Sequence, residues 1–316
     1  MRFLKYLLLP IQLIYSMIIY VRNFLYNKNI YTTYRFEQKV ISVGNLKTGG
    51  TGKTPLIEYL IDLFDHKKIA VLSRGYGRKS DGFILANNKI NSGAAIGDEN
   101  SQLYHKFDNI QIACDKNRVN GVEKLLKLHP NIELILLDDA YQHQSIHRNI
   151  NILLSEYNQL FTHDSLLPIG TLREHKHEKK RADIIIITKC PKNISNEKQQ
   201  SIKNKLCLNK NQTLYFCYIK EYSFINMSTL RRHTINTQET HILVTGIENP
   251  NPLLCFLSEK NILCKHLKFR DHHYFDNNDI TNIIKIQKNN NYSSQLLLTE
   301  KDYYRLTEKD KSKLKK

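Results

Sequence analysis

The stretch VISVGNLKTGGTGKTP, residues 40–55, decides the fold of this chain. Its first four residues form a β-branched run that is typical of a short buried strand. Four glycines follow within nine residues, and apolar residues then recur at helical spacing through Phe64. A strand, a glycine-rich loop, Gly-Lys-Thr and a helix, in that order, predict a phosphate-binding loop.

The chemistry of such a loop follows from its backbone. Glycines let successive N–H groups turn inward around an anion, and the helix N-terminus adds partial positive charge. Lys53 would reach the terminal phosphates of a nucleotide, and the Thr54 hydroxyl would ligate Mg²⁺. The usual spacing places another glycine where Lys47 stands, so an ordinary glycine-rich turn remains the alternative. The predicted cradle comprises Gly49, Gly50, Thr51, Gly52, Lys53 and Thr54.

The following 165 or so residues alternate apolar runs with helical patterns, the sequence signature of a parallel sheet with helices on both faces. Asp138-Asp139 ends one apolar run, as expected of a metal-proximal acid pair at the carboxyl edge of a sheet. The cationic run 175–181 is either a solvated loop or a basic loop that faces a substrate. We expect strands at 68–72, 109–113, 134–137, 149–154, 183–188 and 214–219, and helices from 53 and over 118–128.

A second, smaller α/β unit is predicted after the polar, turn-rich stretch 221–240. Its expected strands lie at 241–245, 262–269 and 295–298, and its helices begin near 252 and 277. The lysine-rich tail 308–316 is expected to fray. The predicted division is an N-terminal helix at 1–28, a phosphate-loop domain at 29–225 and a small domain at 226–316.

The chain of 316 residues carries a formal net charge of +17. A basic surface suits an anionic partner, either nucleic acid or phospholipid, although Lys, Asn and Ile are abundant throughout. No RNA-binding or helix-turn-helix signature is present, so nucleic acid is not an expected partner. The six cysteines form no C-x-x-C pair, which argues against zinc or redox motifs.

Residues 1–28 differ from the rest of the chain. The segment from Phe3 to Tyr20 is mostly apolar, and cations and aromatic residues flank it. Three interpretations stay open: a helix lying in the membrane interface, a helix packed on the protein's own core, and a membrane span, which Pro10 would kink. No small-residue cleavage site follows, so a removed signal peptide is not expected.

Eight motifs in register resemble those of the tetraacyldisaccharide 4′-kinases of lipid A biosynthesis, and they cover nearly the whole chain. In that family the early glycine is also missing at the position of Lys47. The motifs are Ser42-Val43-Gly44-Asn45 with Gly49 to Pro55, Ser73 to Arg78, Gly97-Asp98-Glu99, Asp138 to His143, Leu166 to Glu174, Gly246 to Pro250, Asp271 to Phe275, and Thr299 to Asp302.

The resemblance implies a P-loop NTPase-like α/β fold and transfer of the γ-phosphate of ATP to the 4′-hydroxyl of a lipid-anchored glucosamine disaccharide 1-phosphate. It implies that Asp98 is the catalytic base, that His272 assists it, and that Lys53 is catalytic. Asp138 and Glu99 join Thr54 as implied Mg²⁺ ligands. The implied substrate-binding residues are Arg74, Asp139, Gln142, His143 and Arg173.

An acylated disaccharide stays in the bilayer, because extraction costs about 0.8 kcal/mol for each buried CH₂. We therefore expect a monomeric, peripheral or monotopic enzyme on the cytoplasmic face of the bacterial inner membrane, with the phospholipid surface as partner. Two rivals stay open. One is a partitioning-type ATPase, whose second lysine precedes the paired glycines where Thr48 stands here. The other is an ATP-using nucleic-acid-binding protein.

Overall fold

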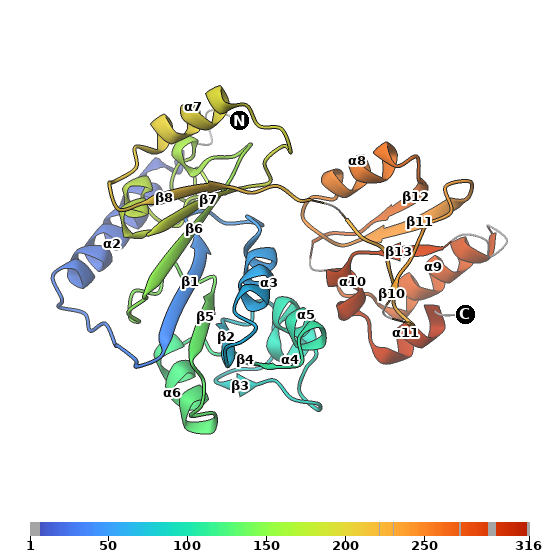
Figure 1. Cartoon of the computed structure of the whole chain (residues 1–316), viewed down its shortest axis with the longest axis horizontal. Helices are drawn as coiled ribbons and strands as arrows, with labels where there is room; N and C mark the ends of the chain where they lie inside the picture. Colours follow the sequence, from blue (N-terminus) through green and yellow to red (C-terminus); the bar gives the residue numbers. More distant parts are fainter. Residues whose placement is uncertain (1–6, 221, 230, 272, 290–294, 315–316) are drawn as a thin grey trace.

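The computed structural model describes residues 7–220, 222–229, 231–271, 273–289 and 295–314. Among these residues, an eight-stranded sheet and a three-stranded sheet lie in two lobes (Figure 1). The large sheet has the order β3-β4-β2-β5-β1-β6-β7-β8, and all neighbours are parallel except β3 and β4. Its strands are β1 (Lys39–Asn45), β2 (Ile69–Ser73), β3 (Ile84–Leu85), β4 (Ile110–Cys114), β5 (Leu134–Asp138), β6 (Ile150–Glu156), β7 (Ile184–Thr188) and β8 (Thr213–Phe216).

Helices cover both faces of the large sheet, as predicted. Successive residues of a strand point to opposite faces, so β1 contributes to two cores: Val43 packs with Ile57 of α3, and Val40 packs with Val122 of α6. Ile202 of α7 packs on the same side as α6, against Ile185. The covering helices are α3 (Lys53–Leu63), α4 (Gly93–Ile96), α5 (Asp98–Lys106), α6 (Arg118–Leu128) and α7 (Asn196–Leu206).

The order of the strands brings two motifs together. β1 lies between β5 and β6, and Val43 is paired with Asp138 in the parallel register. The loop after β1 and the acid pair at the end of β5 therefore meet at one edge of the sheet. Ligand sites of open α/β sheets lie at such a carboxyl edge.

The stretch 79–108 is more ordered than a loop. It contains β3, α4 and α5, and Asp98 is the first residue of α5 rather than a loop residue. Its side chain is buried, as are those of Asn100 and Ser101. The sequence of this stretch, rich in Gly and Asn, predicts a loop, because a polar helix with this burial has no hydrophobic period to reveal it.

The smaller lobe is a second parallel sheet with the order β12-β11-β13. A short antiparallel ribbon, β9 (Ile225–Asn226) and β10 (Arg231–Arg232), lies in the chain between the two sheets. The elements of this lobe are β11 (Thr240–Thr245), α8 (Asn251–Glu259), β12 (Leu263–Lys268), α9 (Asn277–Asn289), β13 (Leu296–Leu298), α10 (Glu300–Arg305) and α11 (Glu308–Leu314).

The predicted fraying of the tail is wrong for residues 308–314, which form α11. Thr307 caps this helix, because its hydroxyl accepts a hydrogen bond from the backbone N–H of Asp310 (3.2 Å). Leu314 packs against the core of the smaller lobe, and the Lys311 ammonium lies 4.7 Å from the centre of the Tyr303 ring. Residues 315–316 lie outside the described residues.

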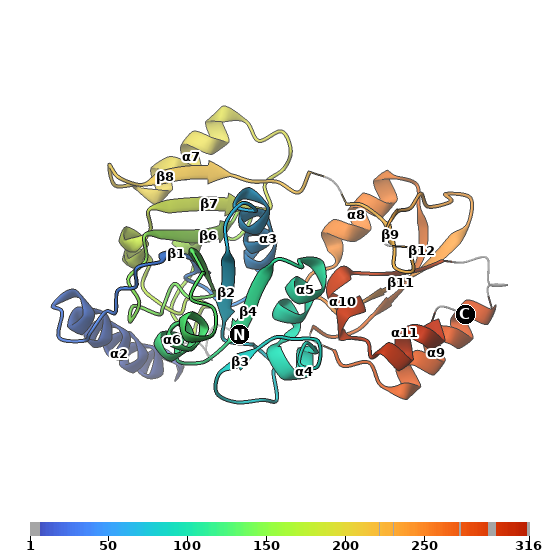
Figure 2. The same cartoon turned by 60° about the horizontal axis from the view of Figure 1, so that its bottom comes forward.

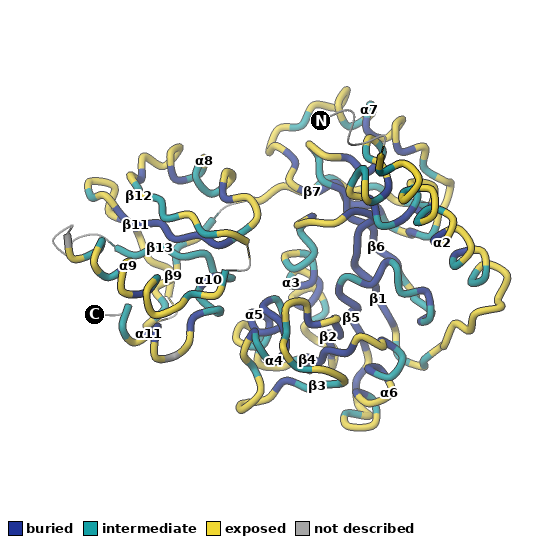
Figure 3. The backbone as a smooth tube through the Cα atoms, turned by 180° about the vertical axis from the view of Figure 1, so that it is seen from behind, coloured by how far each residue is buried: buried dark blue, intermediate teal, exposed yellow. Residues whose placement is uncertain are grey.

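The N-terminal helix α2 (Leu9–Asn27) has two different faces. Pro10 lies in its first turn, where a missing N–H costs nothing, so it begins the helix rather than kinking it. On the inner face, the Tyr15 hydroxyl donates to the carbonyl of Arg173 (2.9 Å), and Asn23 Oδ1 accepts from Gln144 (2.8 Å). Figure 3 shows most of the remaining surface of α2 as exposed.

The outer face of α2 is apolar. Its exposed residues include Leu13 (67%), Ile14 (63%), Met17 (69%) and Ile18 (60%). None of the helices in the described part of the chain combines the length and the hydrophobicity needed to cross a membrane.

Candidate active site

Glycine is needed at the end of β1 and in the loop that follows for two reasons. Gly49 and Gly52 have φ angles of 105° and 87°, in the left-handed region that side chains disfavour. A Cβ at Gly44 would lie 2.7 Å from the backbone nitrogen of Tyr141, so only glycine lets the segment after β5 pass this closely. The glycine pattern is thus explained by backbone geometry.

Side chains from neighbouring strands hold this loop in place. Asn45 donates to the Thr51 hydroxyl (2.8 Å), and the Thr188 hydroxyl donates to the Thr51 carbonyl (2.9 Å). Lys189 Nζ donates to the carbonyl of Gly50 (2.6 Å). None of these three bonds uses an N–H group of the loop, although the Thr51 N–H itself donates to the Gly49 carbonyl (3.1 Å).

The acid pair stands opposite the loop. Lys53 Nζ lies 3.6 Å from Asp139, and the Arg173 guanidinium donates to both oxygens of the same carboxylate (2.7 and 3.0 Å). Although burial favours the neutral acid, the hydrogen bond from Arg173 and the charge of Lys53 lower the pKa of Asp139 to about 2. Asp139 is therefore a permanent anion that orients two cations.

Asp138 is in the opposite electrostatic situation. Burial raises the pKa of Asp138 to about 6, and the charge of Asp139 adds to the shift. Its Oδ1 is buried and has no hydrogen-bond partner in the described structure. A buried, unpartnered carboxylate oxygen is costly unless a ligand or a cation uses it.

The residues around Asp138 fit a magnesium ion better than zinc. Glu99 is close enough to raise the pKa of Asp138 further, and Thr54 follows Lys53 in the first turn of α3. The described residues contain no group of three His, Cys, Asp or Glu side chains that could hold a metal. Mg²⁺ accepts such a sparse oxygen set, since it keeps waters and takes ligands from bound phosphates.

Two predicted substrate-binding residues lie next to this site. Gln142 donates to the carbonyl of Asn45 (2.9 Å), while its own Oε1 is buried without a partner in the described structure. Burial lowers the pKa of His143 to about 3, and the charge of Arg118 acts in the same direction. His143 is thus neutral at physiological pH. Arg74, at the end of β2, is exposed and acts electrostatically on His143.

Arg118 is a site residue that the sequence reasoning missed. It is 1% exposed, and its Nε and Nη2 have no hydrogen-bond partner in the described structure. Burial lowers the pKa of Arg118 to about 10, against the opposing charges of Asp138 and Asp139. The signal was present: an arginine at the first turn of a helix opposes the helix dipole, and such a locally unfavourable choice points to function.

Asp98 forms an ion pair with an arginine of the smaller lobe. Arg305 Nε donates to Asp98 Oδ2 (2.8 Å), and Arg305 Nη1 donates to the Gly246 carbonyl (2.6 Å). Asp302, in the Thr299–Asp302 motif, fixes Arg305 (2.9 Å) and accepts from the Gly246 N–H (3.0 Å). Figures 1 and 2 both place α10 beside α5. His272 lies outside the described residues.

Glu248, from the loop after β11, reaches the phosphate loop. Its Oε2 accepts a hydrogen bond from the Gly50 N–H at 2.7 Å. A Cβ on Gly49 would lie 3.0 Å from its other carboxylate oxygen. A carboxylate of the smaller lobe thus occupies a donor that the sequence assigns to a phosphate.

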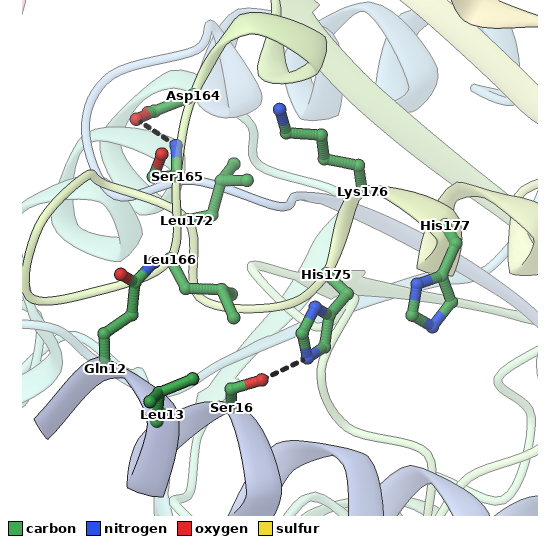
Figure 4. Close-up of a pocket in the computed structure, with 10 residues that line it drawn as sticks. All are labelled: Gln12, Leu13, Ser16, Asp164, Ser165, Leu166, Leu172, His175, Lys176 and His177. Atoms are coloured by element: carbon green, nitrogen blue, oxygen red, sulfur yellow. Dashed lines mark hydrogen bonds between the residues drawn. The ribbon is translucent and has the colours of Figure 1, made fainter. Parts of the chain in front are cut away.

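A hollow of about 520 Å³ lies on the other side of the 164–177 segment, against the first half of α2 (Figure 4). Leu13 and Leu172 give it an apolar side, and Ser16 bonds His175 across it (3.0 Å). Leu172 directly precedes Arg173, the residue that clamps Asp139. Consecutive residues of one segment therefore line the hollow and contact the acid pair. Its other lining residues are Gln12, Asp164, Ser165, Leu166, Lys176 and His177.

Known proteins resemble this chain over nearly its whole length. The tetraacyldisaccharide 4′-kinase of Flavobacterium johnsoniae is 42% identical over 308 residues, which cover 97% of this chain and 88% of that protein. The enzyme of the same name from Flavobacterium psychrophilum is 45% identical over 314 residues, covering 98% and 89%.

A solved structure supports the fold. The crystal structure of LpxK from Aquifex aeolicus in complex with ATP matches with a TM-score of 0.76 and 27% identity, covering 96% of this chain and 91% of that one. The family model described as tetraacyldisaccharide-1-P 4′-kinase matches residues 4–315. The loop, the acid pair and these likenesses agree, and the chain belongs to the tetraacyldisaccharide 4′-kinase family.

Proposed function

We propose that this protein transfers the γ-phosphate of ATP to the 4′-hydroxyl of a tetraacylated glucosamine disaccharide 1-phosphate, a step of lipid A biosynthesis. The observation that carries the proposal is the glycine loop that sets Lys53 3.6 Å from Asp139, beside the unpartnered oxygen of Asp138. Phosphoryl transfer needs positioned cations and acids more than covalent help, and this arrangement supplies them. Membership in the tetraacyldisaccharide 4′-kinase family indicates the lipid disaccharide as the acceptor.

The nucleotide's phosphates would bind the N–H groups of Gly49, Gly50, Thr51, Gly52 and Thr54, with Lys53 on the terminal phosphates. Asp138, Thr54 and Glu99 would hold Mg²⁺. When bound, Mg²⁺ neutralises charge that develops on the transferred phosphoryl group. An acid with a pKa near 6 is ionised at cytoplasmic pH and available to a cation.

The acceptor hydroxyl needs a base, and we assign this role to Asp98 with assistance from His272. In the described state Asp98 is held by Arg305 of the smaller lobe. A carboxylate that takes a proton must loosen such a contact. We therefore propose that binding of both substrates rearranges the two lobes about this ion pair and completes the site.

The lipid disaccharide would lie between the acid pair and α2. Arg173 and Arg74 offer charge to its 1-phosphate, while Gln142, His143 and Asp139 offer hydrogen bonds to sugar hydroxyls. The half-apolar hollow beside Leu13 and Leu172 would take part of an acyl chain. Neutral His143 suits an uncharged hydroxyl partner.

We place the enzyme on the cytoplasmic face of the bacterial inner membrane, held at the phospholipid surface by α2. The exposed apolar face of α2 and the net charge of +17 support this location. We also propose that it acts as a monomer without nucleic acid, and that its two lobes are separate domains, 29–225 and 226–316, after the helix at 1–28.

Replacing Ile14 and Met17 together by glutamate should abolish binding to vesicles that contain anionic phospholipid. Both side chains lie on the outer face of α2 (63% and 69% exposed) and neither lines the hollow, so the inner contacts of the helix stay intact. Each lost apolar anchor should weaken binding about tenfold or more. Vesicle co-sedimentation measures the effect.

Leu128→Glu is the matched control, because Leu128 is an exposed apolar residue (55%) on another helix, α6. It should bind vesicles like the unaltered protein. Point variants are preferable to deletion of residues 1–28, since deletion would leave Glu174 buried without its partner Arg22. Undiminished sedimentation of the double variant would remove the membrane role of α2.

Glu248→Ala should tighten ATP binding about tenfold, because a phosphate no longer competes with a carboxylate for the Gly50 N–H. Titration calorimetry with ATP and Mg²⁺ measures this. Glu259→Ala, at the exposed end of α8, should leave the affinity unchanged. Weaker ATP binding by the Glu248 variant would show that this carboxylate helps to hold the nucleotide instead.

The direct test of the function follows labelled γ-phosphate with purified lipid disaccharide as acceptor. The proposal expects label on the lipid. Label released only as free phosphate, and only when DNA or an anionic membrane is added, would overturn it and favour a regulatory ATPase.

A further inference from the structure

A second pocket lies at the edge of the large sheet opposite the phosphate loop. It has a volume of about 230 Å³ and is largely polar. Asn151, the second residue of β6, and Asp183, which precedes β7, line it at the amino ends of these strands. The remaining lining residues are Tyr26, Asn27, Thr33, Gln144, Ile146, His147, Arg148 and Arg181.

Arg148 is the first unusual feature of this pocket. Within the described residues it makes no ion pair, and its Nη1 reaches only the carbonyls of Tyr141 (3.2 Å) and Ala140 (3.5 Å). Burial lowers the pKa of Arg148 to about 10, and the next largest cause is repulsion from Arg181. Arg148 is partly buried, and a partly buried guanidinium without a carboxylate partner is costly unless an anion joins it.

Arg181 is the second unusual feature of this pocket. Its side chain is 10% exposed and pairs with two acids, Glu174 and Glu178. Nevertheless its Nη1 is buried with no hydrogen-bond partner in the described structure. Two arginines therefore line one small pocket with donor capacity that the protein itself does not use.

The other polar groups in the pocket limit the charge of a ligand. Asp183 accepts a hydrogen bond from the backbone N–H of Asn151 (2.7 Å). Its carboxylate adds one negative charge to the wall of the pocket. Burial lowers the pKa of His147, and the charges of Arg35 and Arg148 do the same, so this ring is a neutral hydrogen-bond partner. Thr33 also lines the pocket, and its hydroxyl donates to the Gln144 carbonyl (3.0 Å). This set suits a small oxyanion that also accepts neutral hydrogen bonds.

We propose that this pocket binds a phosphate group, held by Arg148 and Arg181, at a site separate from the phosphate loop. The phosphate comes either from solution or from a phospholipid headgroup, because Tyr26 and Asn27 of the last turn of α2 form part of the wall. Arg148 also holds the carbonyls of the segment that carries Asp139 and His143. An occupied pocket therefore stabilises the loop that faces the acceptor.

The test measures binding of inorganic phosphate by equilibrium dialysis to full-length protein in a Lys53→Ala background, which weakens the phosphate loop. Adding Arg148→Gln should lower the affinity about tenfold or more. Arg148→Lys should retain part of it, and Arg231→Gln, an exposed arginine of β10, should change nothing. Thr33→Glu places an acid at an exposed lining position at the loss of one hydrogen bond, to the Gln144 carbonyl, so it should abolish binding in a protein that still folds.

A second arm separates the two sources of phosphate. Vesicles of phosphatidylcholine with and without phosphatidic acid are offered to the same variants. If Thr33→Glu loses both phosphate binding and the gain from phosphatidic acid, the headgroup is the ligand; if it loses phosphate binding alone, the ligand is soluble phosphate. If folded Arg148→Gln and Thr33→Glu proteins bind phosphate as tightly as the Lys53→Ala background protein does, the proposal is overturned. Kinase turnover is not the readout, so the result does not depend on the proposed function.

Discussion

Lys53→Ala is expected to lower kcat/KM for ATP by about 10³-fold, the scale seen when one positioned cation or donor is removed from a phosphoryl- or acyl-transfer site. Lys53 is the ammonium that lies between the glycine loop and Asp139. Arg173 still pairs with Asp139 in the variant, so the acid pair keeps its geometry. Steady-state transfer of labelled phosphate to the lipid acceptor measures the loss.

Lys67→Ala is the matched control for this variant. Lys67 follows α3 and pairs with Glu133 (3.0 Å) at the opposite edge of the sheet. It should keep full activity, since a surface ion pair of this kind contributes about 1 kcal/mol or less to stability. Near-normal turnover by folded Lys53→Ala protein would refute the assignment of residues 49–54 as the phosphate cradle.

Asp98→Asn is expected to lower kcat by about 10²–10⁴-fold, the usual contribution of a general base, and to leave ATP affinity unchanged. The amide has the shape of the acid, and its oxygen can still accept from Arg305 Nε. The variant thus separates proton transfer from the contact between the lobes. Calorimetric ATP binding and lipid phosphorylation are measured on the same preparation.

Asp108→Asn, an exposed position just beyond α5, controls for general effects of the substitution. Its turnover should match that of the unaltered protein. If Asp98→Asn phosphorylates the lipid disaccharide at the normal rate, another group takes the proton. If it loses ATP binding as well, the carboxylate is needed for nucleotide binding rather than for chemistry.

The large sheet could be predicted because its signals are local. Buried strands such as β5 are continuous apolar runs, and α6 was predicted to both ends. Asn117 explains the accuracy at α6, since its side chain accepts from the N–H groups of Val119 and Asn120 and caps the first turn. The positions of the phosphate loop and the acid pair follow from the same local patterns and the parallel topology.

Long-range contacts could not be predicted in this way. Arg305 and Asp98 are separated by 207 positions, and Glu248 and Gly50 by 198. No periodicity or spacing links such residues, because the contact depends on how two lobes pack. The family motifs indicated that the Thr299–Asp302 segment matters, but its part in fixing Arg305 is visible only in three dimensions. The functional roles of the site residues stay predictions.

The hydrogen bonds that hold α2 against the large lobe have a consequence for activity. Tyr15 bonds the carbonyl of Arg173, and the side chain of Arg173 bonds Asp139. One tyrosine and one arginine therefore separate α2, the helix that we propose lies on the membrane surface, from the acid pair. Under that proposal, the depth and tilt of α2 at a bilayer act on the acid pair through these same contacts. Bilayers that differ in curvature or lateral pressure should alter turnover even where equal amounts of protein are adsorbed.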